Sequence, residues 1–254
     1  MMSPESTAVY VYGIVPADVE PQPHATGVGD PPAEVTVVRH GEIAALVSTL
    51  ESDRPLGTPK DLRAHEELLD GSAAVTPVLP LRFGAVMTDT DAVESELLEA
   101  NEDEFRAALD QLEGRVQFVI RGRYVEDAIL RELLDENAQA AQLRDEIRGK
   151  PEDATRDARI MLGELINHAI EAKRADDTQK VASALEKLEA LINQREPTHE
   201  EDAVHLAVLI ESARERELEE AVRQLITDWD GRVELDLLGP MAAYDFVTKP
   251  APAR

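Results

Sequence analysis

The side chains best suited to acid–base or metal chemistry in this sequence are its six histidines, since the chain has no cysteine. They are His24, His40, His65, His168, His199 and His205. None has the spacing of a metal-binding set, and the two glutamates after His65 are not followed by the second histidine of a zinc-protease helix. The acidic run after His199 is typical of a solvated loop. We therefore predict no metal site and no catalytic residue.

Motifs for cofactors and nucleophiles are also missing. The glycines at 27 and 29 lack the third glycine of a dinucleotide-binding turn, and Pro31-Pro32 prevents a helix from starting there. No phosphate-binding loop and no Gly-x-Ser-x-Gly sequence occurs. Carboxylates are too abundant for any one pair to stand out as a catalytic dyad. The sequence favours a protein that is not an enzyme and holds no cofactor.

One arginine lies in an unusual setting, the stretch TPVLPLRFG at 76–84. Arg82 stands between Leu81 and Phe83 in a run of high strand propensity, which suggests a buried guanidinium that needs a carboxylate partner. Pro77 and Pro80 argue for a sheet edge, a bulge or a strand start. Arg82 is then either a structural ion-pair partner or a group presented to a ligand or partner carboxylate. Residue types and spacing leave both readings open.

Composition narrows the classes of partner. The 254 residues include 52 Asp plus Glu against 26 Lys plus Arg, a formal net charge of −26. Such a chain repels nucleic-acid phosphates and anionic membranes, and it carries no basic run. No apolar segment approaches the ~18 residues of a membrane span. We expect a soluble, cytoplasmic protein that binds neither nucleic acid nor membrane.

The elements of the first half alternate between strands and helices. Strands are predicted at 8–15, with a bulge at Gly13, and as a hairpin at 34–38 and 43–49 around Gly41. A helix at 59–73 starts at Thr58 or Asp61, turns Leu62, Leu68 and Leu69 inward and carries His65 near the same face. The stretch at 76–84 continues as a strand to about 87, and a helix at 92–112 ends at Gly114. This order predicts a ferredoxin-like domain at 1–114, an antiparallel sheet with helices on one face.

The second half is predicted as an α+β domain at 115–248. Strands are expected at 115–124, 204–210 and 232–238, with a helix at 215–229. Between them, 126–195 shows no strand pattern and predicts helices at 127–148, 154–175 and 178–194. The last two keep near-heptad spacing, which allows a coiled-coil hairpin as well as helices packed on their own sheet. Residues 249–254 look like a tail. The expected fold class is therefore α+β in two domains.

Several stretches resemble sequences of the gas vesicle protein F and L (GvpF/GvpL) family, in the same order along the chain. They are VYVYGIV at 9–15, GEIAALVS at 41–48, VLPLRFG at 78–84 and LLGPMAAYDFV at 237–247, and His65 also fits the family pattern. The resemblance spans nearly the whole chain and is weakest in the helical middle. VLPLRFG and the Gly-Pro plus Tyr-x-Phe-Val ending are its specific parts. Met241, Ala242 and Ala243 stand where the family usually shows further proline or aromatic residues.

This resemblance implies an accessory protein of gas vesicle assembly, associated with gas vesicles. It would bind the small, hydrophobic shell protein and other accessory proteins early in vesicle formation. The two specific motifs make Arg82, Phe83, Tyr244 and Phe246 the candidate partner-binding residues. An open sheet edge or helix groove could shield the shell subunit, while the acidic surface keeps the complex dispersed.

Two alternatives belong to other classes. A small-ligand or cofactor-binding protein of the dimeric α/β-barrel type, such as an oxygenase or haem protein, would need a ligand-facing histidine inside the sheet. His65 and His205 are the candidates for that role. A regulatory ligand-binding module is the third hypothesis.

Overall fold

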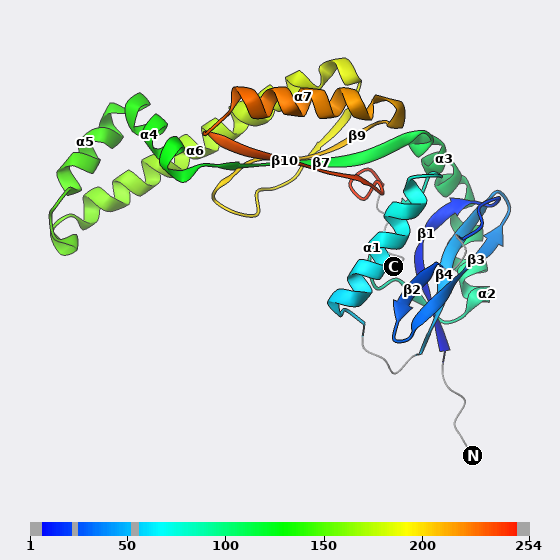
Figure 1. Ribbon diagram of the computed structural model, residues 1–254. Coiled ribbons are helices and arrows are strands. Elements are labelled where there is room, and N and C mark those ends of the chain that lie inside the picture. Colours follow the sequence, from blue (N-terminus) through cyan, green and yellow to red (C-terminus); the bar gives the residue numbers. More distant parts are fainter. Residues whose placement is uncertain (1–6, 22–24, 52–55, 248–254) are drawn as a thin grey trace. The chain divides into compact units, whose positions relative to one another are not determined.

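The computed structural model describes residues 7–21, 25–51 and 56–247 (Figure 1). The expected tail at 249–254 lies outside these residues. The chain divides into two compact units. Unit 1 comprises Met1–Gln117, Glu211–Ala213 and Gly239–Arg254, and unit 2 comprises Phe118–Ile210 and Arg214–Leu238. Each unit is described by itself below.

Unit 1 is built on a sheet with the strand order β2-β3-β4-β1-β5, and β6 also pairs with β1. Its strands are β1 (Thr7–Pro16), β2 (Thr26–Gly29), β3 (Pro32–His40), β4 (Ile43–Glu51), β5 (Leu79–Pro80) and β6 (Val86–Met87). Its helical segments are α1 (Pro59–Ala73), α2 (Thr90–Ala92), the π-helical η1 (Val93–Leu98), the 3-10 turn η2 (Glu99–Asn101) and α3 (Glu102–Leu112). The predicted helix at 92–112 is thus interrupted, and β2 is a strand that the loop-like sequence did not indicate.

Strand β1 is the centre of this sheet, since it pairs with β4 on one side and with β5 and β6 on the other. The register of β1 against β4 shifts between Val11 and Gly13, which confirms the predicted bulge. The bulge brings Gly13 against β5, where a Cβ would lie 2.7 Å from the carbonyl oxygen of Leu79. Only glycine allows so close an approach of the two backbones. The hairpin of β3 and β4 around Gly41 is confirmed too.

The central strands are covered on both faces. Successive residues Ile43–Ser48 of β4 are all buried, and so are Tyr10–Val15 of β1. Helix α1 packs on the face that carries Tyr10 and Tyr12. Segments η1 and α3 also approach β1 and β4, and they cover the opposite face (Figure 1). A sheet with both helices on one face was expected, and the continuous apolar runs of β1 and β4 are the physical reason for the difference.

Unit 2 contains most of a second sheet with the order β10-β7-β9-β8. The strands are β7 (Arg115–Tyr124), β8 (Leu191–Gln194), β9 (Asp202–Glu211) and β10 (Val233–Met241). The helical segments are α4 (Glu126–Glu136), α5 (Ala138–Ile147), η3 (Glu152–Ala154), α6 (Arg156–Ala184), η4 (Glu186–Leu188) and α7 (Glu215–Asp228). The 3-10 turn η5 (Ser212–Arg214) precedes α7, and only its last residue belongs to this unit. Figure 1 shows α7 and the second half of α6 on one side of this sheet, with α4 and α5 packed along the first half of α6.

Two predictions for the helical middle are wrong. The helices expected at 154–175 and 178–194 are one continuous helix, α6, followed by the strand β8, so they form no coiled-coil hairpin. The helix expected at 127–148 is divided at Asn137, whose side chain caps α5 by accepting the N–H groups of Gln139 and Ala140. The sequence pattern did not indicate strand β8, because all four of its residues are exposed and it lies at the end of the described sheet, beside β9.

A charged network holds α6 in place at the expected break. Asp177 is fully buried and accepts hydrogen bonds from Tyr124 (2.9 Å), Arg232 (2.8 Å) and Lys180 (2.9 Å). The Arg232 guanidinium also binds Glu132 of α4 at 2.7 Å. Burial and the Asp177 charge raise the pKa of Tyr124, which therefore stays protonated and donates. The network ties α4, α6, β7 and the residue before β10 to one another.

The fold class is α+β, as the sequence predicts. Among the helices of the described residues, none combines the length and the apolar character needed to cross a membrane.

Candidate functional site

Helix α1 positions the first part of the site. A capping box fixes its start, because Thr58 Oγ1 accepts the N–H of Asp61 while the Asp61 carboxylate accepts the N–H of Thr58. The box confirms the predicted start at 59 and turns His65 and Leu69 into the core. Leu62, which was expected to face inward, is exposed, because the buried stripe follows positions 61, 65 and 69.

His65 is hydrogen-bonded to Tyr10 and to the backbone of Leu81. Its Nδ1 lies 3.0 Å from the Tyr10 hydroxyl oxygen, which accepts the backbone N–H of Gly84 at 3.0 Å. Because the Gly84 N–H points at this oxygen, we assign the hydroxyl proton to His65 Nδ1, with the ring neutral and protonated at Nε2. The ring also hydrogen-bonds the backbone of Leu81. Burial lowers the pKa of His65, whereas it raises the pKa of Tyr10 to about 12.

An aromatic cluster surrounds this hydrogen bond. The rings of Tyr10 and Tyr12 lie 4.8 Å apart between centroids, and the Phe83 ring lies 5.6 Å from His65 and 6.0 Å from Tyr10. The Tyr12 hydroxyl bonds the Ser48 hydroxyl and accepts the N–H of Val28. Phe83, half-buried, is therefore held by the core and is only partly available to a partner.

Arg82 is exposed, so the interpretation of a buried guanidinium is wrong. Strand β5 has only two residues, and the chain turns at Phe83-Gly84 before β6 resumes the pairing with β1. The strand therefore does not continue to 87, and no alternation forces Arg82 inward. The expected sheet edge is confirmed. Within the described residues Arg82 has no ion-pair partner, which leaves its charge available at the surface.

The C-terminal motif at 237–247 contacts helix α1 as well. The backbone N–H of Ala242 donates to Asp70 of α1 at 2.9 Å. Three residues on, Asp245 bonds Gln117 twice: its N–H donates to Oε1 at 3.0 Å, and its Oδ2 accepts from Nε2 at 2.6 Å. Two segments that lie far apart in the sequence, 78–84 and 242–246, are thus both fastened around α1.

Tyr244 and Phe246 project from this fastened segment. Tyr244 keeps 36% of its surface exposed, and Phe246 is half-buried. Burial raises the pKa of Tyr244, and the nearby charges of Asp70 and Glu66 raise it further, so the hydroxyl stays neutral. Together with Arg82, these side chains supply a cation, a phenol and an apolar ring. Such groups can bind a protein surface.

The other chemical candidates are used internally. No set of three or more His, Asp or Glu side chains able to hold a metal ion occurs among the described residues. His65 is bonded to Tyr10 and to the Leu81 backbone. His205 is half-buried, with Nδ1 at 3.3 Å from the carbonyl oxygen of Glu196 and Nε2 at 3.4 Å from Arg195.

Sequence reasoning missed Asp70 and Gln117, which fasten the C-terminal motif. In the sequence they are an ordinary helix carboxylate and a polar residue within a strand. The signal in the sequence is the position of Gln117 within a run of apolar strand residues. A polar side chain that is buried there, as Gln117 is in the structure, needs a hydrogen-bond partner.

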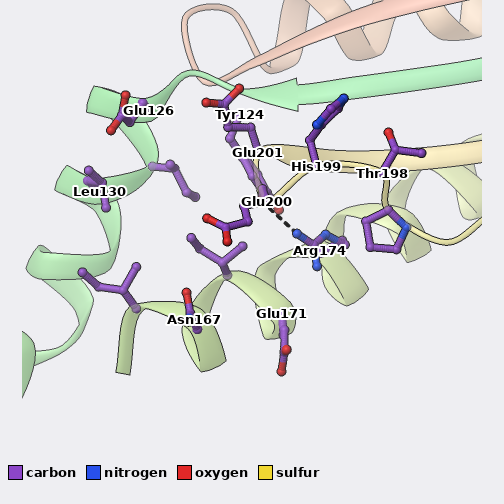
Figure 2. Close-up of a pocket in the computed structure, with 14 residues that line it drawn as sticks. Tyr124, Glu126, Leu130, Asn167, Glu171, Arg174, Thr198, His199, Glu200 and Glu201 are labelled. Atoms are coloured by element: carbon purple, nitrogen blue, oxygen red, sulfur yellow. Dashed lines mark hydrogen bonds between the residues drawn. The ribbon is translucent and has the colours of Figure 1, made fainter. Parts of the chain in front are cut away.

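A second candidate surface lies in unit 2, where a cleft of about 750 Å³ opens between α4, α6 and the loop before β9 (Figure 2). Ile129 and Leu130 of α4 and Ile166 and Ile170 of α6 line it. Glutamates stand around these apolar residues: Glu126, Glu171, Glu200 and Glu201.

The loop that forms one wall of this cleft is held by Asp202. The carboxylate oxygen Oδ2 accepts the N–H of Thr198 (2.7 Å), its hydroxyl (2.9 Å) and the N–H of His199 (3.0 Å). Arg174 of α6 donates to the carbonyl oxygens of Asp202 and Glu200. Burial alone would raise the pKa of Asp202, but the three hydrogen bonds and the Arg121 charge outweigh it and lower this pKa to about 2.

Replacing Asp202 by asparagine is expected to lower the free energy of unfolding by about 1 kcal/mol at pH 7, since bonds to an ionised acceptor are roughly twice as strong as neutral ones. The carboxylate is favoured in the folded state, so its contribution is present above the unfolded pKa of about 3.9 and is lost as pH falls toward 2. Urea titrations at pH 7 and pH 3 would measure this. An equal difference between wild type and variant at both values would contradict it.

The fold defines an α+β protein of two compact units, each with a candidate surface formed by exposed side chains. A family model described as "Gas vesicle synthesis protein GvpL/GvpF" matches residues 8–248. The chain therefore belongs to the GvpL/GvpF family of gas vesicle synthesis proteins, and the resemblance seen in its motifs is confirmed.

Individual relatives are similar to this chain over nearly the full length of both sequences. Gas vesicle protein F of Streptomyces sp. (strain CB03234) is 30% identical over 94% of this chain and 99% of its own length. Gas vesicle protein F of Dolichospermum flosaquae is 25% identical over 95% and 98%. The crystal structure of GvpF from Anabaena sp. PCC7120 superposes with a TM-score of 0.80 at 23% identity, covering 95% of this chain and 98% of that one. This last similarity supports the fold.

Proposed function

We propose that this chain is a non-enzymatic accessory protein of gas vesicle formation that binds the hydrophobic shell protein, and other accessory proteins, through a surface around α1. Family membership supports the gas vesicle role. The observation that carries the choice of surface is the attachment of both motif segments to α1, which leaves Arg82 and Tyr244 exposed beside a buried aromatic core.

The chemistry of this surface suits a shell subunit before assembly. Such a subunit exposes apolar faces and strand edges. Tyr244 and Phe246 offer apolar contact area, and Arg82 offers a guanidinium for a carboxylate or a backbone carbonyl. The net charge of −26 keeps the complex dispersed. Binding at this surface requires no bound cofactor.

Co-expression with a gas vesicle shell protein, followed by affinity pull-down, tests the proposal. Arg82→Glu and the double variant Tyr244→Ala/Phe246→Ala are each expected to weaken binding about tenfold, or about 1.4 kcal/mol. Arg82 is exposed, so its replacement should leave the free energy of unfolding within about 0.5 kcal/mol.

Matched controls separate this surface from general charge and apolar effects. Arg115→Glu makes the same charge change at another exposed arginine, and Ile226→Ala shortens an exposed apolar side chain on α7 of unit 2. Both should bind as the wild type does. If the Arg82 and Tyr244/Phe246 variants fold normally and retain full binding, the surface is the wrong one.

A further inference from the structure

The cleft in unit 2 has an apolar floor made by two helices. Ile166 and Ile170 are four residues apart, so they lie on one face of α6, and Leu130 of α4 stands across from them. All three are only half-buried, although Ile129 beside them is buried. A groove between two helices with half-exposed aliphatic side chains is the geometry into which a third helix packs.

The rim of the cleft is acidic and unneutralised. The side chains of Glu126, Glu200 and Glu201 are exposed, and none has an ion-pair partner within the described residues. Glu171 has only the exposed His168, with 3.8 Å between their nearest atoms. Figure 2 shows Glu126 on the α4 side and Glu200 and Glu201 on the loop side, so carboxylates stand on both sides of the floor.

One arginine, Arg174, also lines the cleft, and its charge offsets only one of the four glutamate charges. The Arg174 Nε donates to the carbonyl oxygen of Asp202 at 2.6 Å, and its Nη2 donates to that of Glu200 at 3.0 Å. Its guanidinium is committed to holding the loop. The Asp202 carboxylate fixes the same loop from the other side, so the wall that carries Glu200 and Glu201 is ordered before any partner arrives.

We propose that this cleft is a docking groove for a basic amphipathic helix of a protein partner. Aliphatic side chains on one face of that helix would pack on Ile166, Ile170 and Leu130, and its Lys or Arg side chains would meet the rim glutamates. A second copy of this chain fits poorly, because it would bring another net charge of −26 toward an acidic rim. The inference concerns unit 2 and does not depend on the surface around α1.

A designed peptide provides the probe. It has about 15 residues of Leu and Lys, with Leu on one helical face, and carries fluorescein for anisotropy measurements with the full chain at physiological salt. A second peptide has the same composition with the leucines dispersed around the helix. The first peptide is expected to bind about tenfold more tightly, because only its leucines can pack together on the apolar floor. Long-range attraction to an acidic protein is the same for both peptides, since their charges are equal.

Variants in the cleft and matched variants outside it locate the binding. Glu200→Gln/Glu201→Gln is expected to weaken binding about fivefold, and Ile166→Asp about tenfold or more. The controls are Glu219→Gln/Glu220→Gln on α7 and Ile160→Asp on α6, which make the same changes at exposed positions outside the cleft. Both controls should bind within about twofold of the wild type.

The glutamate pair stands on an exposed loop, so its variant tests the proposal even if Ile166→Asp fails to fold. Equal binding of the two peptides would overturn the docking groove. So would a folded glutamate-pair variant with wild-type affinity, or controls that lose as much affinity as the cleft variants. The pull-down of the shell protein with the Arg82 variants tests the surface around α1. Its outcome does not decide whether the cleft in unit 2 binds a basic helix.

Discussion

Replacing Asp177 by alanine is expected to lower the free energy of unfolding of unit 2 by about 3–5 kcal/mol, because it leaves the charge of Arg232 partly buried and short of a partner. Three donors converge on this carboxylate, from Tyr124, Lys180 and Arg232. Tyr124 and Arg232 would lose this acceptor in a region that water enters poorly, whereas the exposed Lys180 would stay solvated. Far-UV circular dichroism with urea titration would measure the change.

The neighbouring aspartate provides the control. Asp176 lies on the same helix and is exposed, so Asp176→Ala should change the free energy of unfolding by no more than about 0.5 kcal/mol. Asp177→Asn keeps an acceptor for the Tyr124 hydroxyl and should fall between the two. Should Asp177→Ala be no less stable than Asp176→Ala, the network would have no role in holding α6.

Acidification is expected to destabilise unit 1 through His65. The pKa of His65 is lowered by burial, so the folded state favours the neutral ring. Its contribution to stability is therefore complete above the unfolded pKa of about 6.5 and is lost as pH falls below that value, by up to about 1.4 kcal/mol per pH unit. Between pH 7 and pH 5 this amounts to as much as about 2 kcal/mol. Protonation of Nδ1 would also force the Tyr10 hydroxyl proton away from this nitrogen, and the other partner of the hydroxyl, the Gly84 N–H, is a donor and cannot accept that proton.

His65→Gln tests this assignment. Glutamine does not titrate, and it offers an acceptor to the Tyr10 hydroxyl together with a donor, so the variant should show a flatter dependence of unfolding free energy on pH between 6.5 and 5. His168→Gln is the matched control, because His168 is exposed on α6 in the other unit. If His65→Gln and wild type lose stability in parallel over this range, His65 is not the titrating group.

Elements with local signals could be predicted from the sequence. The capping box at Thr58, the glycine at the β3–β4 turn and the run of β-branched and aromatic residues in β7 are each signals within a few positions. Predictions failed where contacts between residues distant in the sequence determine the secondary structure. A new helix was predicted to start at 178, directly after Asp177. The structure instead has one helix, α6, through this point, where Asp177 accepts hydrogen bonds from Tyr124 and Arg232. Strand β8 is defined only by its pairing with β9.

The candidate site was predictable in its parts and not in its arrangement. The motif residues Arg82 and Tyr244 could be selected from resemblance, but the exposure of Arg82 depends on how soon β5 ends. The meeting of the two motifs on α1 rests on single hydrogen bonds, such as that of Asp70 to Ala242, which no spacing rule specifies. The cleft in unit 2 arises from residues of α4, α6 and a loop, and none of these segments carries a recognisable motif.

The network around Arg232 has a consequence for optical spectroscopy. Trp229 is the sole tryptophan of the chain, and its ring centroid lies 6.0 Å from the guanidinium carbon of Arg232. Three of the four tyrosines, Tyr10, Tyr12 and Tyr244, belong to unit 1. Selective excitation of the indole therefore reports on unit 2 alone, and tyrosine absorbance is weighted toward unit 1. The native sequence thus carries separate intrinsic labels with which each unit can be followed without an added dye.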